Sequence, residues 1–139
     1  EDGSLSWAFP MGEAKLVGIA AEDIGKSAYG IFKAGDDYIG KTVGIYGEAL
    51  TIKQMGDTLT KVLGVGTITY NAVDADTYRG FGFPGADELG NMFQVYRDFE
   101  QQVLGARSAE TTRKLNPDVQ TYEEFVAGKK DTILGALGG

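Results

Sequence analysis

The chain has 139 residues, enough for one domain, and a formal net charge of −7 at pH 7. An acidic balance without long charged blocks argues against a surface for nucleic acid or anionic membranes, and no apolar run approaches the length of a membrane span. Because the sequence has no cysteine and no histidine, it excludes disulfide frameworks, thiol nucleophiles, Ser-His-Asp triads and histidine-based metal sites.

The first half of the chain predicts short strands mixed with helices. The expected elements are strands at residues 5–10, 15–20, 42–46 and 67–73, and helices at residues 21–34, 51–64 and 74–80. The short turn between the first two strands favours a hairpin. The first helix shows an apolar stripe made of Ile24, Ala28, Ile31 and Phe32. Thr51 and Gln54 have the spacing of a capping box, and Gly64 suits the end of that helix.

Residues 81–96 predict the centre of the fold, because an aromatic loop turns there into a helix with a heavy apolar face. Pro84 and Gly85 punctuate the loop, and Asp87 suits the first helical turn. The expected apolar face contains Leu89, Met92, Phe93, Tyr96, Phe99 and Val103.

The rest of the chain predicts two further helices. A break at residues 105–108 precedes a short helix at residues 109–115, which Pro117 stops. Thr121 and Glu124 form a second capping box and open a last helix. We expect a domain over residues 1–133 and a Gly-rich tail over residues 134–139, frayed or foreign to the domain.

One group of residues is the candidate cleft for a substrate or a partner. It contains Trp7, Phe9, Met11, Phe83, Pro84, Gly85 and Tyr96. The aromatic members of the group could equally be core, which is the commoner place for large apolar side chains. Because Met92, Phe93 and Tyr96 belong to the strongest apolar face, we expect them to pack behind the loop at Phe83.

Short motifs elsewhere favour structural interpretations. Tyr29 and Lys33 have the Tyr-x-x-x-Lys spacing of short-chain dehydrogenases, yet no dinucleotide-binding unit precedes them, so an ordinary helix pair is the preferred interpretation. Residues 64–66 lack the third glycine of a phosphate loop and suit a helix end. Residues 74–76 lack the later ligands of a calcium loop and suit a helix start.

Several segments in one order resemble the NmrA-like family of atypical short-chain dehydrogenase/reductases. The resemblance runs over residues 4–132, and the loop from Gly82 to Ala86 is its most specific part. The other matching pieces are Glu22-Asp23-Ile24-Gly25, Tyr38-Ile39-Gly40-Lys41, Asn91-Met92-Phe93 and Leu115-Asn116-Pro117. The resemblance implies an α/β, Rossmann-type protein with two lobes, of which this chain is the C-terminal one.

In such proteins the N-terminal lobe carries the glycine fingerprint and binds NADP(H). We therefore expect NADP(H) in the full-length protein and no cofactor on this segment alone, with no catalytic, cofactor-binding or metal residue among these positions. The chain does not begin with methionine, which is expected of a fragment, of a processed product or of an incompletely determined chain.

The resemblance leaves two functions open. One is a redox-sensing regulator that acts through a regulatory protein partner, and the other is a reductase whose substrate is a small carbonyl compound or quinone. A free-standing binding domain is a third reading. The expected protein is cytoplasmic, with a nuclear location and a homodimer as further options, and it binds neither nucleic acid nor membrane directly.

Overall fold

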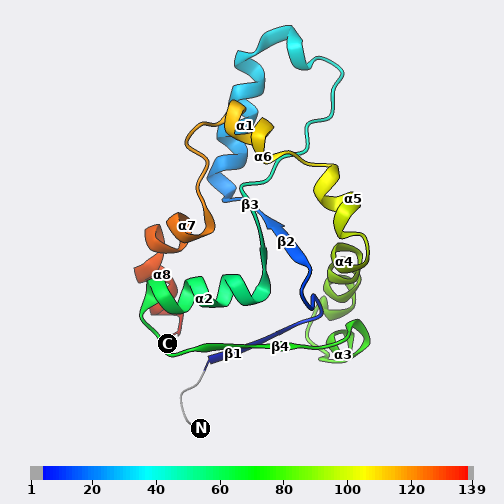
Figure 1. Cartoon of the computed structure of the whole chain (residues 1–139), viewed down its shortest axis with the longest axis vertical. Helices are drawn as coiled ribbons and strands as arrows, with labels where there is room; N and C mark the ends of the chain where they lie inside the picture. Colours follow the sequence, from blue (N-terminus) through cyan, green and yellow to red (C-terminus); the bar gives the residue numbers. More distant parts are fainter. Residues whose placement is uncertain (1–4, 138–139) are drawn as a thin grey trace.

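A computed structural model describes residues 5–137, which form short strands surrounded by helices (Figure 1). The elements in chain order are β1 (Leu5–Phe9), β2 (Lys15–Gly18), α1 (Ala21–Lys33), the 3-10 helix η1 (Gly35–Tyr38), β3 (Glu48–Thr51), α2 (Ile52–Leu63), β4 (Ile68–Ala72), α3 (Ala75–Arg79), α4 (Ala86–Asp98), α5 (Glu100–Gly105), α6 (Ala109–Leu115), α7 (Tyr122–Gly128) and α8 (Lys130–Leu137). The expected class, mixed α/β with short strands, is confirmed.

The strands form two separate pairs. β1 and β4 are parallel, with Leu5 opposite Ile68, and β2 and β3 are antiparallel, with Lys15 opposite Thr51. The predicted hairpin of the first two strands is therefore wrong. Parallel pairing needs a long crossover between the strands, and the chain from β2 to α2 supplies it. The turn after β1, where Gly12 has a φ of +53°, directs β2 away to pair with β3.

The predicted strand at residues 42–46 is also wrong, and the true strand β3 begins two residues later. The backbone of this segment is paired with the α5–α6 region instead of a neighbouring strand. The Ser108 N–H donates to the Gly44 carbonyl at 3.1 Å, and the Tyr46 N–H donates to the Thr112 hydroxyl at 3.1 Å. Gly44 lies against the backbone of Ala106, so no side chain fits there. β-Branched residues were misleading here because tertiary contacts satisfy the backbone.

The core lies where β1 and β4 meet α2, α3 and α4, in the lower half of Figure 1. Its buried centre is Met11, Ile52, Tyr78 and Phe93, and the partly buried side chains around them are Trp7, Phe9, Ala14, Leu16, Met55, Tyr70, Val73 and Tyr96. Elements from the whole first two thirds of the chain contribute to it, so its burial fixes the crossover between β1 and β4.

Helix α1 buries a different face from the predicted one. Ile24 is half exposed and Phe32 is 81% exposed, whereas Asp23 and Ser27 are fully buried. The helix packs against α6 at the top of Figure 1, and Gly30 lies directly against the backbone of Leu115. Small and polar residues face α6 because the two backbones approach too closely for a large side chain. The predicted apolar stripe is therefore largely in solvent.

Local signals for helix ends are confirmed at the predicted places. Thr51 and Gln54 make the reciprocal bonds of a capping box, as do Thr121 and Glu124. Gly64 ends α2 in the left-handed conformation, with a φ of +74°. These ends follow from side chains within four residues, and so they need no tertiary information.

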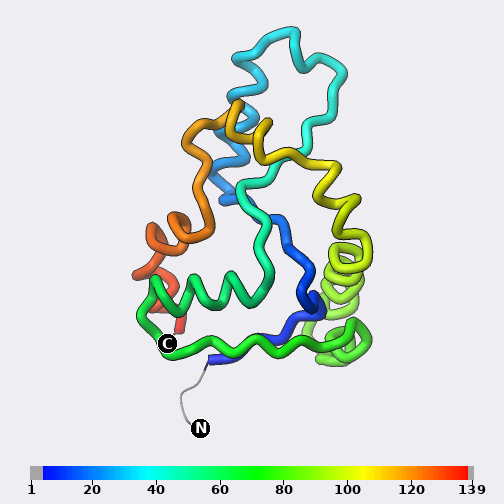
Figure 2. Tube along the Cα trace, in the orientation of Figure 1, coloured from blue at the N-terminus to red at the C-terminus, as the bar shows by residue number. Residues whose placement is uncertain are grey.

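The predicted central helix is interrupted, and the last helix is divided. α4 ends at Asp98, and Phe99 has a φ of −121° before α5 begins. Lys129 similarly separates α7 from α8. α8 runs through Leu137, so residues 134–137 of the Gly-rich tail are helical, and residues 138–139 lie outside the described residues. The tube trace shows α7 and α8 folding back beside α2 (Figure 2).

The α1–α6 packing makes a testable prediction at two glycines of the same helix. Gly30→Ala should lower the free energy of unfolding of the full-length protein by about 1–3 kcal/mol or more, because the new methyl group meets the Leu115 backbone. Gly25→Ala meets nothing within 4 Å and should raise it by about 0.5–1 kcal/mol. Urea unfolding measures both, and equal effects at the two sites would contradict the close packing.

Candidate functional site

The structure gathers the aromatic members of the predicted cleft into one cluster. The rings of Trp7 and Phe9 are 5.7 Å apart, edge to face, and Phe9 lies 5.3 Å from Phe93. Tyr78 contacts Phe93 at 5.5 Å and Phe83 at 5.7 Å, again edge to face. These are favourable aromatic geometries. β1, α3, the loop before α4 and α4 itself thus meet through their rings.

The seven predicted cleft residues divide into a buried part and a rim. Met11 is fully buried, and Trp7, Phe9 and Tyr96 are partly buried. The turn that holds Met11 is fixed by the Tyr70 hydroxyl, which lies 3.1 Å from the Phe9 carbonyl and 3.2 Å from the Gly12 carbonyl. Phe83, Pro84 and Gly85 are exposed, and they form the rim of the cluster. Their role in binding stays a prediction.

The rim continues onto an apolar surface of α4, which we call the α4 surface. It consists of Phe81, Phe83, Leu89, Met92, Val95 and Phe99, all between 37% and 52% exposed. Only part of the predicted apolar helix face is thus buried within residues 5–137. Phe93 is buried and Tyr96 is partly buried, but the expectation that Met92 packs behind the loop is wrong, because its side chain is 38% exposed. An apolar surface of this extent is typical of a place where another protein surface packs.

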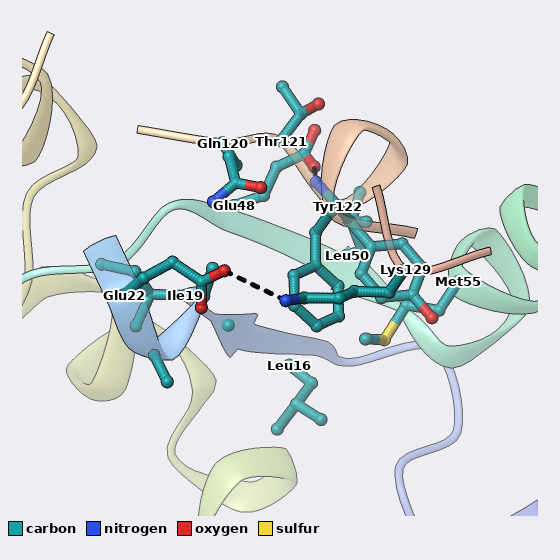
Figure 3. Close-up of a pocket in the computed structure, with 14 residues that line it drawn as sticks. Leu16, Ile19, Glu22, Glu48, Leu50, Met55, Gln120, Thr121, Tyr122 and Lys129 are labelled. Carbon is teal, nitrogen blue, oxygen red and sulfur yellow. Dashed lines mark hydrogen bonds and ion pairs between the residues drawn. The ribbon is translucent and has the colours of Figure 1, made fainter. Parts of the chain in front are cut away.

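The main cavity of the described residues lies on the other side of β2 and β3. Its volume is about 440 Å³, within the range of small-molecule pockets. The residues that line it are Leu16, Gly18, Ile19, Ala20, Ala21, Glu22, Glu48, Leu50, Met55, Gln120, Thr121, Tyr122, Phe125 and Lys129 (Figure 3). None of the predicted cleft residues belongs to this set, so sequence reasoning missed this cavity.

Three charged side chains stand around the cavity. Glu22 of α1 and Lys129 after α7 point toward each other across it, with 3.6 Å between Oε1 and Nζ (Figure 3). Glu48 of β3 accepts a hydrogen bond from the Tyr122 N–H at 2.8 Å, which places a carboxylate at the start of α7. Burial raises the pKa of the Tyr122 phenol above its ordinary value.

Asp23 holds the wall of the cavity in place. Its carboxylate accepts hydrogen bonds from the Gln120 N–H at 2.9 Å, from Gln120 Nε2 at 3.1 Å and from Asn116 Nδ2 at 3.2 Å, and Lys26 Nζ lies 3.1 Å away. Burial would raise the pKa of Asp23, but the donors from Gln120, Lys26 and Asn116 outweigh it and lower this pKa. The segment from Asn116 to Gln120 is thereby tied to α1.

The sequence signals for this cavity were incomplete. The capping box at Thr121 marked the start of α7, but Glu48 lies 74 residues before Tyr122 along the chain and reaches this helix start only in the folded protein. The Glu22-Asp23 pair was visible as acidic residues in a first helical turn. Nothing in that pattern showed that Asp23 is buried and Glu22 is at the cavity.

The short motifs for which we preferred a structural interpretation include no residue of the predicted cleft and none of the cavity. Tyr29 is 66% exposed, and Lys33 Nζ lies 5.7 Å from its ring centroid, a surface cation–π pair on α1. Asp74 caps α3 by accepting from the Thr77 N–H at 2.7 Å. Within residues 5–137, no group of acidic side chains is arranged to hold a metal ion, and no helix is long and apolar enough to span a bilayer.

A family model matches most of the chain. The model of the NmrA-like family covers residues 1–126. The chain belongs to the NmrA-like family. The collinear pieces that carried the resemblance, including the loop from Gly82 to Ala86, lie within this match, and the predicted family is confirmed.

Solved structures agree on the fold. NmrA, a negative transcriptional regulator, is similar with a TM-score of 0.75 and 20% identity over 99% of this chain, and its complex with NAD gives 0.74 and 22% over 99%. A nucleoside-diphosphate-sugar epimerase from Staphylococcus aureus gives 0.70 and 22% over 88%. At such identities the likeness shows a Rossmann-type fold alone. The chain spans 47% of the length of the NmrA chains and 43% of the epimerase.

The aromatic cluster predicts a contrast between two phenylalanines in the full-length protein. Phe93→Ala should lower the free energy of unfolding by about 3–5 kcal/mol, because the side chain is 6% exposed and packs against the rings of Phe9 and Tyr78. Phe83→Ala at the 38% exposed rim should cost less stability. Thermal melts measure both, and a Phe93 variant that melts like the parent would contradict the cluster.

The Asp23 network predicts a pH effect. The folded pKa of this carboxyl lies below the unfolded value of about 3.9, so its stabilising contribution is complete above about pH 4 and is lost as the pH falls through the folded pKa. Asp23→Asn should lower the free energy of unfolding by roughly 2–3 kcal/mol at pH 7 and reduce the acid dependence below pH 4.

Urea unfolding of the full-length protein between pH 3 and 7 measures this effect. The matched control is Asp36→Asn in the exposed helix η1, which should leave the stability and its pH dependence unchanged. An Asp23→Asn variant with the parent's stability at pH 7 would show that the network does not hold the fold.

Proposed function

We propose that this chain is the C-terminal lobe of a dinucleotide-binding NmrA-like protein that acts as a redox-sensing regulator through a protein partner. The observation that carries the proposal is the α4 surface, which leaves Phe83, Met92 and Phe99 uncovered in a chain spanning under half of its structural neighbours. Family membership and the likeness to a negative transcriptional regulator, also solved with NAD, support it.

The elements of this lobe indicate which part of the protein would bind the cofactor and which part would contact a partner. No described strand is followed by a glycine loop and a helix in the order that dinucleotide phosphates require, since Gly64 ends a helix and precedes a strand. The cofactor, expected to be NADP(H), would therefore be held by the rest of the protein. This lobe would supply the surface through which the oxidised or reduced state reaches a partner.

The alternative is a reductase in which this lobe lines the substrate cleft. Phe9 and Met11 stand at the carboxyl end of β1, which is parallel to β4, and ligands of α/β sheets bind beyond the carboxyl ends of parallel strands. A small carbonyl compound or quinone would then pack against Phe9, Phe83 and Tyr96.

One experiment on the full-length protein separates the two functions. NADPH and NADH oxidation is followed with a panel of quinones and ketones, and calorimetry compares the oxidised and reduced dinucleotides. A regulator should bind the two redox forms with different affinities and oxidise the reduced form no faster than a blank. Sustained turnover with any acceptor would establish the reductase instead.

The proposal also predicts where the cofactor does not bind. Residues 1–139 alone should show no NADPH or NADH binding in calorimetry, because the phosphate-binding unit is not among the described elements. The full-length protein is the positive control. Micromolar binding to the isolated segment would place a dinucleotide site within this lobe and contradict the division of labour.

A further inference from the structure

The cavity of Figure 3 is built entirely from this chain. Its walls come from β2, β3, the start of α1, α2 and α7, which are held together by the β2–β3 ladder and by the Asp23 network. The cavity shares no residue with the predicted cleft around Phe9 and Phe83, although two of its lining residues, Leu16 and Met55, also pack against the core that contains Met11.

The inner walls are mostly apolar and partly aromatic. Leu16, Ile19, Leu50 and Met55 supply aliphatic and thioether surface, and the rings of Tyr122 and Phe125 supply aromatic faces. Such walls favour a flat apolar ring system, because it buries its area against them and stacks on the two rings.

The charged groups around the cavity favour an occupant with a positive charge. Glu22 and Glu48 bring two carboxylates, and Lys129 brings one ammonium group, so the lining carries a net charge of −1 from these three side chains. Lys129 forms an ion pair with Glu22. This ion pair is weak, because the two charged atoms are 3.6 Å apart and both side chains are about half exposed. Glu48 uses Oε2 for the Tyr122 N–H, and Oε1 has no hydrogen-bond partner among the described residues.

We propose that this cavity binds a small amphiphilic amine, whose flat aromatic ring packs between Leu50, Tyr122 and Phe125 and whose ammonium group pairs with Glu48. The ammonium group gains a charge-assisted hydrogen bond at the free oxygen of Glu48 and the attraction of nearby aromatic faces. An anion of the same shape meets the excess of carboxylates, and a neutral isostere keeps the packing and loses the ion pair. The site is a ligand-binding site of the lobe, beyond the dinucleotide and partner functions proposed above.

The test compares three indole probes on the full-length protein by calorimetry. Tryptamine is the cation, tryptophol is the neutral isostere and indole-3-propionate is the anion. Tryptamine should bind roughly tenfold more tightly than tryptophol, and indole-3-propionate most weakly, because only the first makes the charged bond. Failure of all three probes to bind, or equal affinity for the three, overturns the proposal and leaves the dinucleotide experiments unaffected.

Variants locate the binding. Glu48→Gln keeps an acceptor for the Tyr122 N–H and removes the charge, so it should weaken tryptamine roughly tenfold and leave tryptophol unchanged. Lys129→Gln frees Glu22 and should strengthen tryptamine a few-fold. The matched control is Glu110→Gln, an exposed residue of α6 outside the cavity, which should change neither probe.

Filling the cavity gives the last check. Leu50→Trp should abolish binding of both tryptamine and tryptophol, and Ala20→Leu at the start of α1 serves the same purpose if the first variant does not fold. A filled variant that melts cooperatively and still binds tryptamine like the parent would place the amine elsewhere and overturn the assignment, as would an unchanged tryptamine affinity in Glu48→Gln.

Discussion

The buried carboxylate of Asp23 is the contact on which the upper part of this lobe depends. It joins the first turn of α1 to Asn116 and Gln120, more than 90 residues along the chain. An unpaired buried carboxylate would be very costly, so the donors must all be present for the segment to close. The closure in turn positions the start of α7 relative to α1 and therefore shapes the cavity between α1, β3 and α7.

The lower part of the lobe is held differently, by rings rather than by a charge. Phe9, Tyr78 and Phe93 pack edge to face or stacked around the buried Met11, and α2 covers β1 and β4 from the side. This core uses one side of α4 and leaves the α4 surface apolar and uncovered. The two halves therefore offer different chemistry: an apolar surface on α4 for which we propose a protein partner, and a half-open cavity lined by two glutamates and one lysine for which we propose a small cation.

Local chemistry made the sequence reliable at particular positions. Thr51 and Thr121 have their capping partners three residues away, Gly64 needs only its own freedom at positive φ, and Pro117 disfavours helical backbone at the residue before it. Phe93 could be recognised as core because it stands in the densest apolar stretch. The family was recognisable because its pieces occur in one order, and order along the chain is preserved whatever the fold does.

The sequence by itself thus determined where α2 and α7 begin, the mixed α/β class, the family and the burial of Phe93. Only the tertiary structure decided the pairing of β1 with β4, the failure of residues 42–46 to form a strand, the face that α1 buries and the cavity around Glu48. The physical reason is the same in each case. Those features depend on partners tens of residues away, such as Ile68, Thr112, Leu115 and Tyr122, and the pattern of neighbouring residues carries no information about which distant group satisfies a backbone or a charge.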